Sequence, residues 1–119
     1  MRQKRKVEFF FLRYVPAIVE DRFLDIGVLM VESGGTNFVA ARFLRDWNQV
    51  LKIDADADVE VLQAMAREIE REWLRTLDRA AILRKMEDSF SNSIQISPKM
   101  ISITYDPAKE LERLASTFL

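Results

Sequence analysis

The pattern of apolar and polar positions predicts a β-hairpin over residues 22–43, and we expect the rest of the chain to be organised around it. Two runs of apolar, β-branched and aromatic residues flank the pair Gly34-Gly35 in this segment. A two-residue turn with positive φ at both positions needs glycines of this kind. With Gly34-Gly35 as the turn, the strand pairing places Gly27 opposite Arg42.

This pairing predicts one wholly apolar face for the hairpin, because successive side chains of a strand point to opposite faces. The apolar face consists of Ile26, Val28, Met30, Val39, Ala41 and Phe43. The other face is apolar near the turn and carries Asp25 and Arg42 at its open end. The sequence therefore predicts a soluble globular domain with the hairpin in its core.

A strand over residues 7–15 is expected before the hairpin, and it is apolar on both faces. Phe9 and Phe11 point one way, and Phe10, Leu12 and Tyr14 point the other. A strand of this kind is usually central in its sheet, and Pro16 ends it because proline cannot continue the ladder. Together with the hairpin, it predicts a three-stranded antiparallel meander.

Helical spacing and strand alternation predict the elements of the second half. We expect helices over about 44–53, 57–77 and 79–88, short strands over 94–97 and 100–105, and a last helix opened by Asp106-Pro107. The predicted fold class is α+β. Its small antiparallel sheet consists of the three-stranded N-terminal meander plus one or two short later strands, with about four helices packed on one face. A chain of 119 residues is expected to form a single domain over 1–119.

The charge balance gives no strong indication of a partner. The chain has 18 Lys plus Arg and 19 Asp plus Glu, for a net charge of −1. Near neutrality provides no long-range attraction to nucleic acid or anionic lipid, so nucleic acid is disfavoured as a partner. It also leaves little repulsion between copies, so a homo-oligomer is compatible with the sequence.

The absence of cysteine and histidine excludes several kinds of chemistry. A thiol nucleophile, a histidine general base, a Ser-His-Asp triad and a zinc site with nitrogen or sulfur ligands are all ruled out. We predict no catalytic residue, no cofactor and no metal. No signal peptide or membrane span is recognisable, because Glu8 and Arg13 interrupt the early apolar run. The expected location is the cytoplasm, without contact to a membrane.

The open end of the hairpin contains the most specific candidate site, a binding slot formed by Arg13, Arg22, Asp25, Gly27 and Arg42. Gly27 leaves space opposite Arg42, and Asp25 is diagonal to Arg42 on the same face. An arginine held by a carboxylate beside such a space can receive a phosphate or carboxylate group. The alternative is a structural ion pair that keeps one sheet edge soluble.

Polar residues in the segment before residue 97 form a second candidate. Ser91, Asn92 and Gln95 are close in sequence and can line a polar pocket. Turn and capping hydrogen bonds are the alternative role for such residues.

Two further patterns resemble functional motifs. The triple Asp54, Asp56 and Asp58 resembles the start of a calcium loop, but Val59 and Met65 occupy the positions of its glycine and its final glutamate. Capping of the following helix is the alternative. The basic segment 1–6, followed by the aromatic residues of the first strand, suggests a platform for single-stranded nucleic acid, although the glycines of that pattern are missing. A frayed terminus before a core strand is the alternative there.

Several spaced motifs resemble a bacterial family catalogued as domain of unknown function 3037. They are Phe11-Leu12-Arg13-Tyr14-Val15-Pro16, Arg22 with Asp25-Ile26-Gly27-Val28-Leu29, Arg42-Phe43 with Asp46-Trp47, Ser89-Phe90-Ser91-Asn92 with Ile94-Gln95-Ile96-Ser97-Pro98, and Asp106-Pro107 with Glu110-Leu111. The resemblance covers nearly the whole chain, although the family typically has asparagine where this chain has Asp25. It implies no catalytic residue, and it implies a kinase-like protein partner of the HipA type.

Three functions follow from the sequence and the resemblance. The first is a non-enzymatic cytoplasmic protein-interaction module, an accessory to a HipA-like kinase partner. The alternative is a nucleic-acid-binding protein that uses the basic N-terminus and the first strand. The third is a carboxylate-dependent hydrolase, for which no carboxylate cluster is visible.

Overall fold

The computed structural model describes residues 3–16, 22–34, 38–75, 78–89 and 94–119, and in these it contains an open five-stranded antiparallel sheet and four helices. In chain order the elements are β1 (Arg5–Tyr14), β2 (Leu24–Glu32), β3 (Val39–Phe43), α1 (Asn48–Ile53), α2 (Val59–Arg75), α3 (Arg79–Ser89), β4 (Ile94–Ile96), β5 (Met100–Thr104) and α4 (Pro107–Phe118). The predicted α+β class is confirmed. The first short helix begins at Asn48, four residues later than the pattern predicted.

β1 is the central strand, as predicted, and the meander β1-β2-β3 is confirmed. β2 pairs with one edge of β1, while β5 pairs with the first half of the other edge and β4 with the second half. Ser97 lies between β4 and β5 and bonds to β1 where the two strands meet its edge. Its side-chain oxygen accepts a hydrogen bond from the backbone N–H of Phe11 at 2.8 Å, and its own N–H donates to the carbonyl of Phe11 at 2.8 Å.

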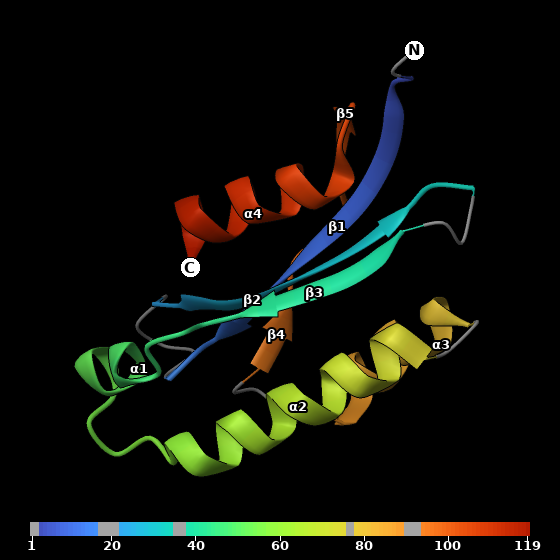
Figure 1. Cartoon of the computed structure of the whole chain (residues 1–119). Coiled ribbons are helices and arrows are strands. Elements are labelled where there is room, and N and C mark those ends of the chain that lie inside the picture. The colour runs from blue at the N-terminus through green and yellow to red at the C-terminus, as the bar shows by residue number, and fades with distance from the viewer. Residues whose placement is uncertain (1–2, 17–21, 35–37, 76–77, 90–93) are drawn as a thin grey trace.

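Both faces of the sheet are covered by helices, so there are two hydrophobic clusters. Phe10, Leu12 and Tyr14 of β1 belong to the cluster that contains Trp73 of α2, whereas Phe9 and Phe11 belong to the cluster under α4. Figure 1 shows α1, α2 and α3 on one side of the strands and α4 on the other. The expectation that all helices pack on one face is therefore wrong, because a strand that is apolar on both sides needs cover on both.

The predicted register of the hairpin is also wrong, by one residue. Val28, and not Gly27, lies opposite Arg42, and Gly27 lies opposite Phe43. The N–H of Glu32 donates to the carbonyl of Phe38 at 2.9 Å, so the connection comprises residues 33–37 instead of the two residues Gly34-Gly35. Gly34 does adopt a positive φ of 70°, while Gly35 lies outside the described residues.

The changed register redistributes the side chains that the sequence had placed on one apolar face. Val39, Ala41 and Phe43 face α2 together with Leu29, whereas Val28, Met30 and Ala40 belong to the cluster under α4. β2 also contains a β-bulge, because Leu12 pairs with Gly27 but Arg13 pairs with Asp25. The extra residue, Ile26, joins the α2-side cluster although it is three positions from Leu29.

Gly27 is required by close packing against Phe43. A Cβ atom on Gly27 would lie 2.7 Å from both Cδ1 and Cε1 of the Phe43 ring and 3.3 Å from the carbonyl oxygen of Arg42. The space that the sequence assigned to a ligand is thus occupied by the aromatic ring.

We expect Gly27→Ala to lower the free energy of unfolding by about 1–3 kcal/mol, because the added methyl overpacks this contact. Urea denaturation measures the change. The matched background is Phe43→Leu, which replaces the ring with a smaller, flexible side chain, and there the added alanine should cost clearly less. Equal losses in the two backgrounds would show that the ring contact is not the reason for glycine at this position.

Candidate functional site

The five residues of the predicted binding slot do not come together in the structure. Arg13 pairs with Asp25 through Nε and Oδ1 at 3.2 Å, and Arg42 pairs with Glu112 of α4 at 2.8 Å. The predicted diagonal contact between Asp25 and Arg42 is therefore wrong, since the bulge and the shifted register turn the two residues toward different partners. Arg22 is exposed.

The Arg13–Asp25 pair is less exposed than the Arg42–Glu112 pair, although Arg42 makes the shorter contacts, with Nε and Nη2 both 2.8 Å from Oε1 of Glu112. The Arg13 guanidinium also lies 4.6 Å from the centre of the Phe23 ring, in the range of a cation–π contact. The side chains of Arg13 and Asp25 are 27% and 16% exposed, against 49% for each partner of the other pair. Arg42 and Glu112 thus form an exposed ion pair between β3 and α4.

A shallow cleft of about 270 Å³ adjoins the Arg42–Glu112 pair. Besides these two residues it is lined by Phe43, Arg45, Asp46, Gln49, Ala115, Ser116 and Leu119. The charges in the cleft are mixed, because Arg42 and Arg45 line it together with Asp46 and Glu112. Asp46 in addition accepts a hydrogen bond from the backbone N–H of Asn48 at 3.0 Å, so it acts at the start of α1. The cleft is consequently not a concentrated anion site.

The predicted polar pocket is described only in part. Gln95 is exposed on β4 and pairs with Arg13 of β1 across the ladder. Ser91 and Asn92 lie outside the described residues. A binding role for this group stays a prediction.

The aspartates of the calcium-like segment serve the local fold. Asp58 Oδ1 accepts a hydrogen bond from the N–H of Val61 at 3.1 Å, as the capping interpretation predicted for the start of α2. Asp54 accepts a hydrogen bond from the N–H of Asp56 at 3.1 Å and another from the hydroxyl of Tyr14. Among the described residues there is no group of three or more acidic side chains placed to hold a metal ion.

The phenol of Tyr14 has a strongly shifted pKa. Burial first, and then the hydrogen bond to Asp54, raise the pKa of Tyr14 to about 12. The contact joins the end of β1 to the loop between α1 and α2, and it is built into the core. The hydrogen bond between Tyr14 and Asp54 therefore has a structural role.

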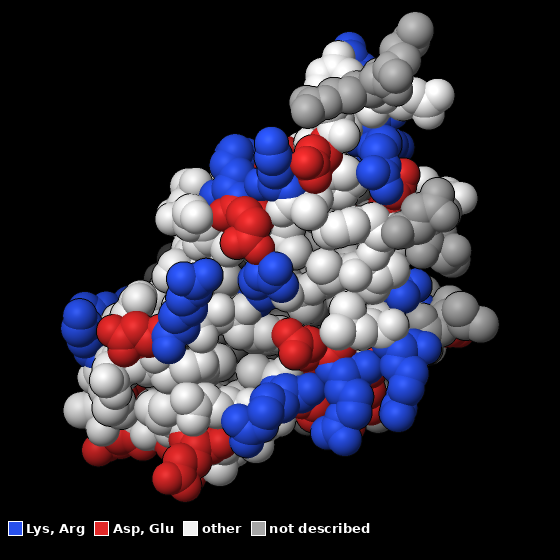
Figure 2. Space-filling model, in the orientation of Figure 1, with Lys and Arg blue, Asp and Glu red and all other residues white. Residues whose placement is uncertain are grey.

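The aromatic residues of β1 do not form a stacking platform for nucleic-acid bases. Phe9, Phe10, Phe11 and Tyr14 are each no more than 9% exposed, since the two clusters enclose them. Basic side chains do gather along α2, where Arg67, Arg71 and Arg75 recur every four residues. Glu68, Glu70 and Glu72 lie on the same helix, and Figure 2 shows acidic side chains among the basic ones there.

Sequence reasoning missed a row of exposed apolar side chains on β5 and just after it. Ile101, Ile103 and Tyr105 are 51%, 58% and 51% exposed, and they alternate with Ser102 and Thr104. Residues 100–105 include no charged side chain. The strict alternation was the signal available in the sequence, but the sequence analysis predicted only a short strand over residues 100–105 and not the direction of its apolar face.

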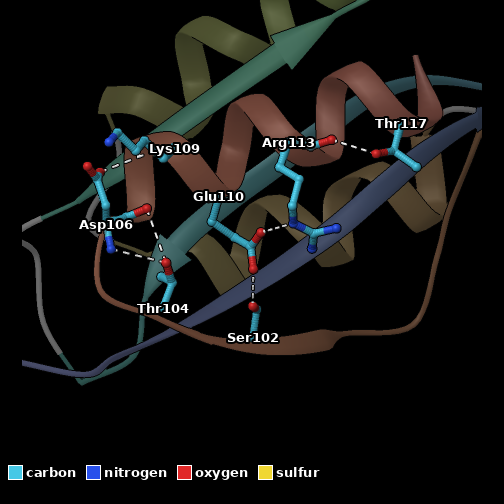
Figure 3. A network of polar contacts seen from close by, with 7 residues as sticks. All are labelled: Ser102, Thr104, Asp106, Lys109, Glu110, Arg113 and Thr117. Carbon is cyan, nitrogen blue, oxygen red and sulfur yellow. Dashed lines mark hydrogen bonds and ion pairs between the residues drawn. The ribbon is translucent and has the colours of Figure 1, made fainter.

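The polar side chains of β5 fix that direction, because they contact α4 (Figure 3). Ser102 donates a hydrogen bond to Glu110, which also accepts one from Arg113. Thr104 accepts a hydrogen bond from the N–H of Asp106 at 3.0 Å, and Asp106 caps α4 through the N–H of Lys109. The bond from Arg113 is the main reason that the pKa of Glu110 is lowered, so this carboxylate stays ionised at neutral pH. The isoleucines therefore point away from α4.

β5 is an edge strand, and its outer edge pairs with no other described strand. The opposite edge of the sheet, β3, is protected. The indole N–H of Trp73 is shared between the carbonyl oxygens of Ala40 and Met30, at 3.1 and 3.2 Å, and α2 and α4 contact this strand. Natural edge strands are usually protected by charges, covering elements or short length. β5 is short, but it carries no charged side chain and no described element covers its outer edge.

The described helices offer no candidate for a membrane span, since none combines the necessary length and apolarity.

The chain belongs to the family described as "Protein of unknown function (DUF3037)", whose model matches residues 9–119. The match confirms the resemblance seen in the sequence motifs. No curated protein and no solved structure matches the chain.

We expect Arg42→Ala to lower the free energy of unfolding by about 0–1 kcal/mol, because the pair with Glu112 is half exposed and screened by salt. Arg13→Ala is the comparison and should cost about 1–3 kcal/mol, since it removes a less exposed pair and the contact with Phe23. Urea denaturation at low and high salt distinguishes the two. A larger loss for Arg42→Ala than for Arg13→Ala would contradict this order.

We expect stability to fall as the pH rises from 10.0, the ordinary pKa of a tyrosine, to about 12, the pKa of Tyr14 in the fold. In this range the unfolded chain releases the phenol proton while the folded chain keeps it, so ionisation favours unfolding. Titration of tyrosinate absorbance in a Tyr105→Phe variant isolates Tyr14, as the chain has two tyrosines. Tyr14→Phe should remove this part of the alkaline loss. A normal titration of Tyr14 in the folded chain would contradict the assignment.

Proposed function

We propose that the chain is a non-enzymatic protein-interaction module that binds another polypeptide through the free edge of β5. The single observation that carries this proposal is the unprotected edge strand with its exposed row of Ile101, Ile103 and Tyr105. Free backbone groups on such an edge provide affinity for an added strand, and alternate side chains provide specificity.

Exposed apolar side chains on other described elements differ from the row on β5, and this difference supports the proposal. Leu74 on α2, which is also exposed, has the charged residues Glu70, Arg71 and Arg75 beside it along the helix. Single exposed apolar side chains are ordinary, whereas a contiguous group marks an interaction site. The proposed location is the cytoplasm, and the proposed partners are the kinase-like protein that the family resemblance implied or a second copy of the chain.

The nucleic-acid alternative lacks a comparable observation. The aromatic side chains that would stack on bases are buried, and the arginines of α2 are balanced by glutamates. Base stacking on exposed aromatic groups and a continuous basic groove are the usual means of binding single strands. The hydrolase hypothesis gains no support from a metal site, since no three acidic side chains of the described residues are placed to hold a metal ion.

Affinity capture at native expression tests the proposal with three chains: the wild type, Ile103→Lys and Leu74→Lys. Ile103 and Leu74 are 58% and 49% exposed, so either lysine should leave the fold intact. We expect a protein that binds the wild type and Leu74→Lys but not Ile103→Lys, with the same ranking when both purified proteins are mixed. Equal capture by all three chains would contradict the proposal. Capture of nucleic acid, with a steep dependence on salt, would favour the alternative.

A further inference from the structure

We propose that the strand added to β5 is β5 of a second copy of the chain, so that two sheets join edge to edge in a symmetric dimer. This inference rests on the proposed function and names the occupant of the same edge. Its basis is the self-complementarity of the segment Met100–Thr104.

An antiparallel pairing about a two-fold axis at Ser102 matches the whole of β5 with itself. Ser102 then lies opposite Ser102 of the second copy, and Ile101 lies opposite Ile103 of the second copy. Met100 similarly lies opposite Thr104. Each pair joins residues of the same face, because side chains alternate with a period of two. The exposed isoleucines of the two copies therefore form one continuous apolar group.

The flanking charges are compatible with this register. Lys99, which forms an ion pair with Glu8 at 3.0 Å, would lie beside Tyr105 of the second copy. A lysine next to an aromatic ring is a favourable neighbour, whereas like charges opposite each other would destabilise the pairing. The paired stretch contains no charge at all, and the net charge of −1 gives little repulsion between copies.

The helices leave room for the second copy. α4 starts next to β5 and then crosses toward β2 and β3, and α2 and α3 contact β2, β3 and β4 (Figure 1). The edge of β5 and its isoleucine face therefore remain open on the described part of the chain. Because the paired strands are short, the interface is at the small end of the range for specific complexes. We expect a weak dimer with a micromolar dissociation constant.

Sedimentation velocity of the purified full chain tests this, from low to high micromolar concentration. We expect the wild type to shift from monomer to dimer. Ile103→Lys should raise the dissociation constant more than about tenfold, since the change occurs twice in a symmetric interface. Leu74→Lys is the matched control and should leave it unchanged. Melting temperatures show that both variants remain folded.

A second measurement tests the register. The chain has no cysteine, so Ser102→Cys introduces a single thiol at the proposed two-fold axis. Residues directly opposite each other in an antiparallel pair have the spacing that a disulfide requires. We expect mild oxidation to link two Ser102→Cys chains much faster than two Ser116→Cys chains, whose thiol is exposed on α4.

The inference is overturned if the wild type remains monomeric, if Ile103→Lys and Leu74→Lys weaken the dimer equally, or if both cysteine variants link at the same rate. A monomeric wild type whose Ile103→Lys variant still loses a captured protein would refute the self-pairing and leave the proposed function in place. A monomeric wild type whose captured proteins do not depend on Ile103 would refute both.

Discussion

β1 presents large apolar side chains to both sides of the sheet, and the remaining elements are arranged to cover them. Its even-numbered residues, Phe10, Leu12 and Tyr14, need α2 on one side, and Phe9 and Phe11 need α4 on the other. Two helices far apart in the sequence are thereby placed on opposite faces. Each aromatic side chain buried in this way removes a large apolar area from water, which is the main favourable contribution to folding.

The same arrangement leaves the first half of β1 with thinner cover. α2 lies beneath β2 and β3 and contacts the ring of Phe10 through Trp73, with ring centres 6.1 Å apart. Toward the start of β1, the residues on the same face as Phe10 are Glu8 and Lys6. In β5, Ile101 pairs with Glu8 and Ile103 pairs with Lys6. The exposed apolar row therefore lies where no described helix reaches. A second chain is a physically reasonable source for the missing cover.

The sequence predicted the element types well, because period-two and helical patterns are local. The faces of β1, the cap at Asp106 and the cap at Asp58 all follow from neighbouring residues and were confirmed. The register of the hairpin was not predictable in this way. Since both of its faces are buried, shifting β3 by one residue exchanges one apolar face for another, and the hydrophobic pattern hardly distinguishes the two.

The candidate site depended on that register, so one wrong residue pairing changed the predicted surroundings of Gly27 and Arg42. Gly27 was interpreted as a space beside Arg42, but the shift brings the ring of Phe43 into it and turns Arg42 toward Glu112. Contacts between strands and distant helices, such as this one, are not encoded in local spacing. The edge position of β5 is likewise a property of the whole sheet, because it depends on Pro98 and Ser97 dividing one edge of β1 between two strands. An uncharged strand is ordinary inside a sheet and becomes an interaction surface only when the topology leaves it outermost.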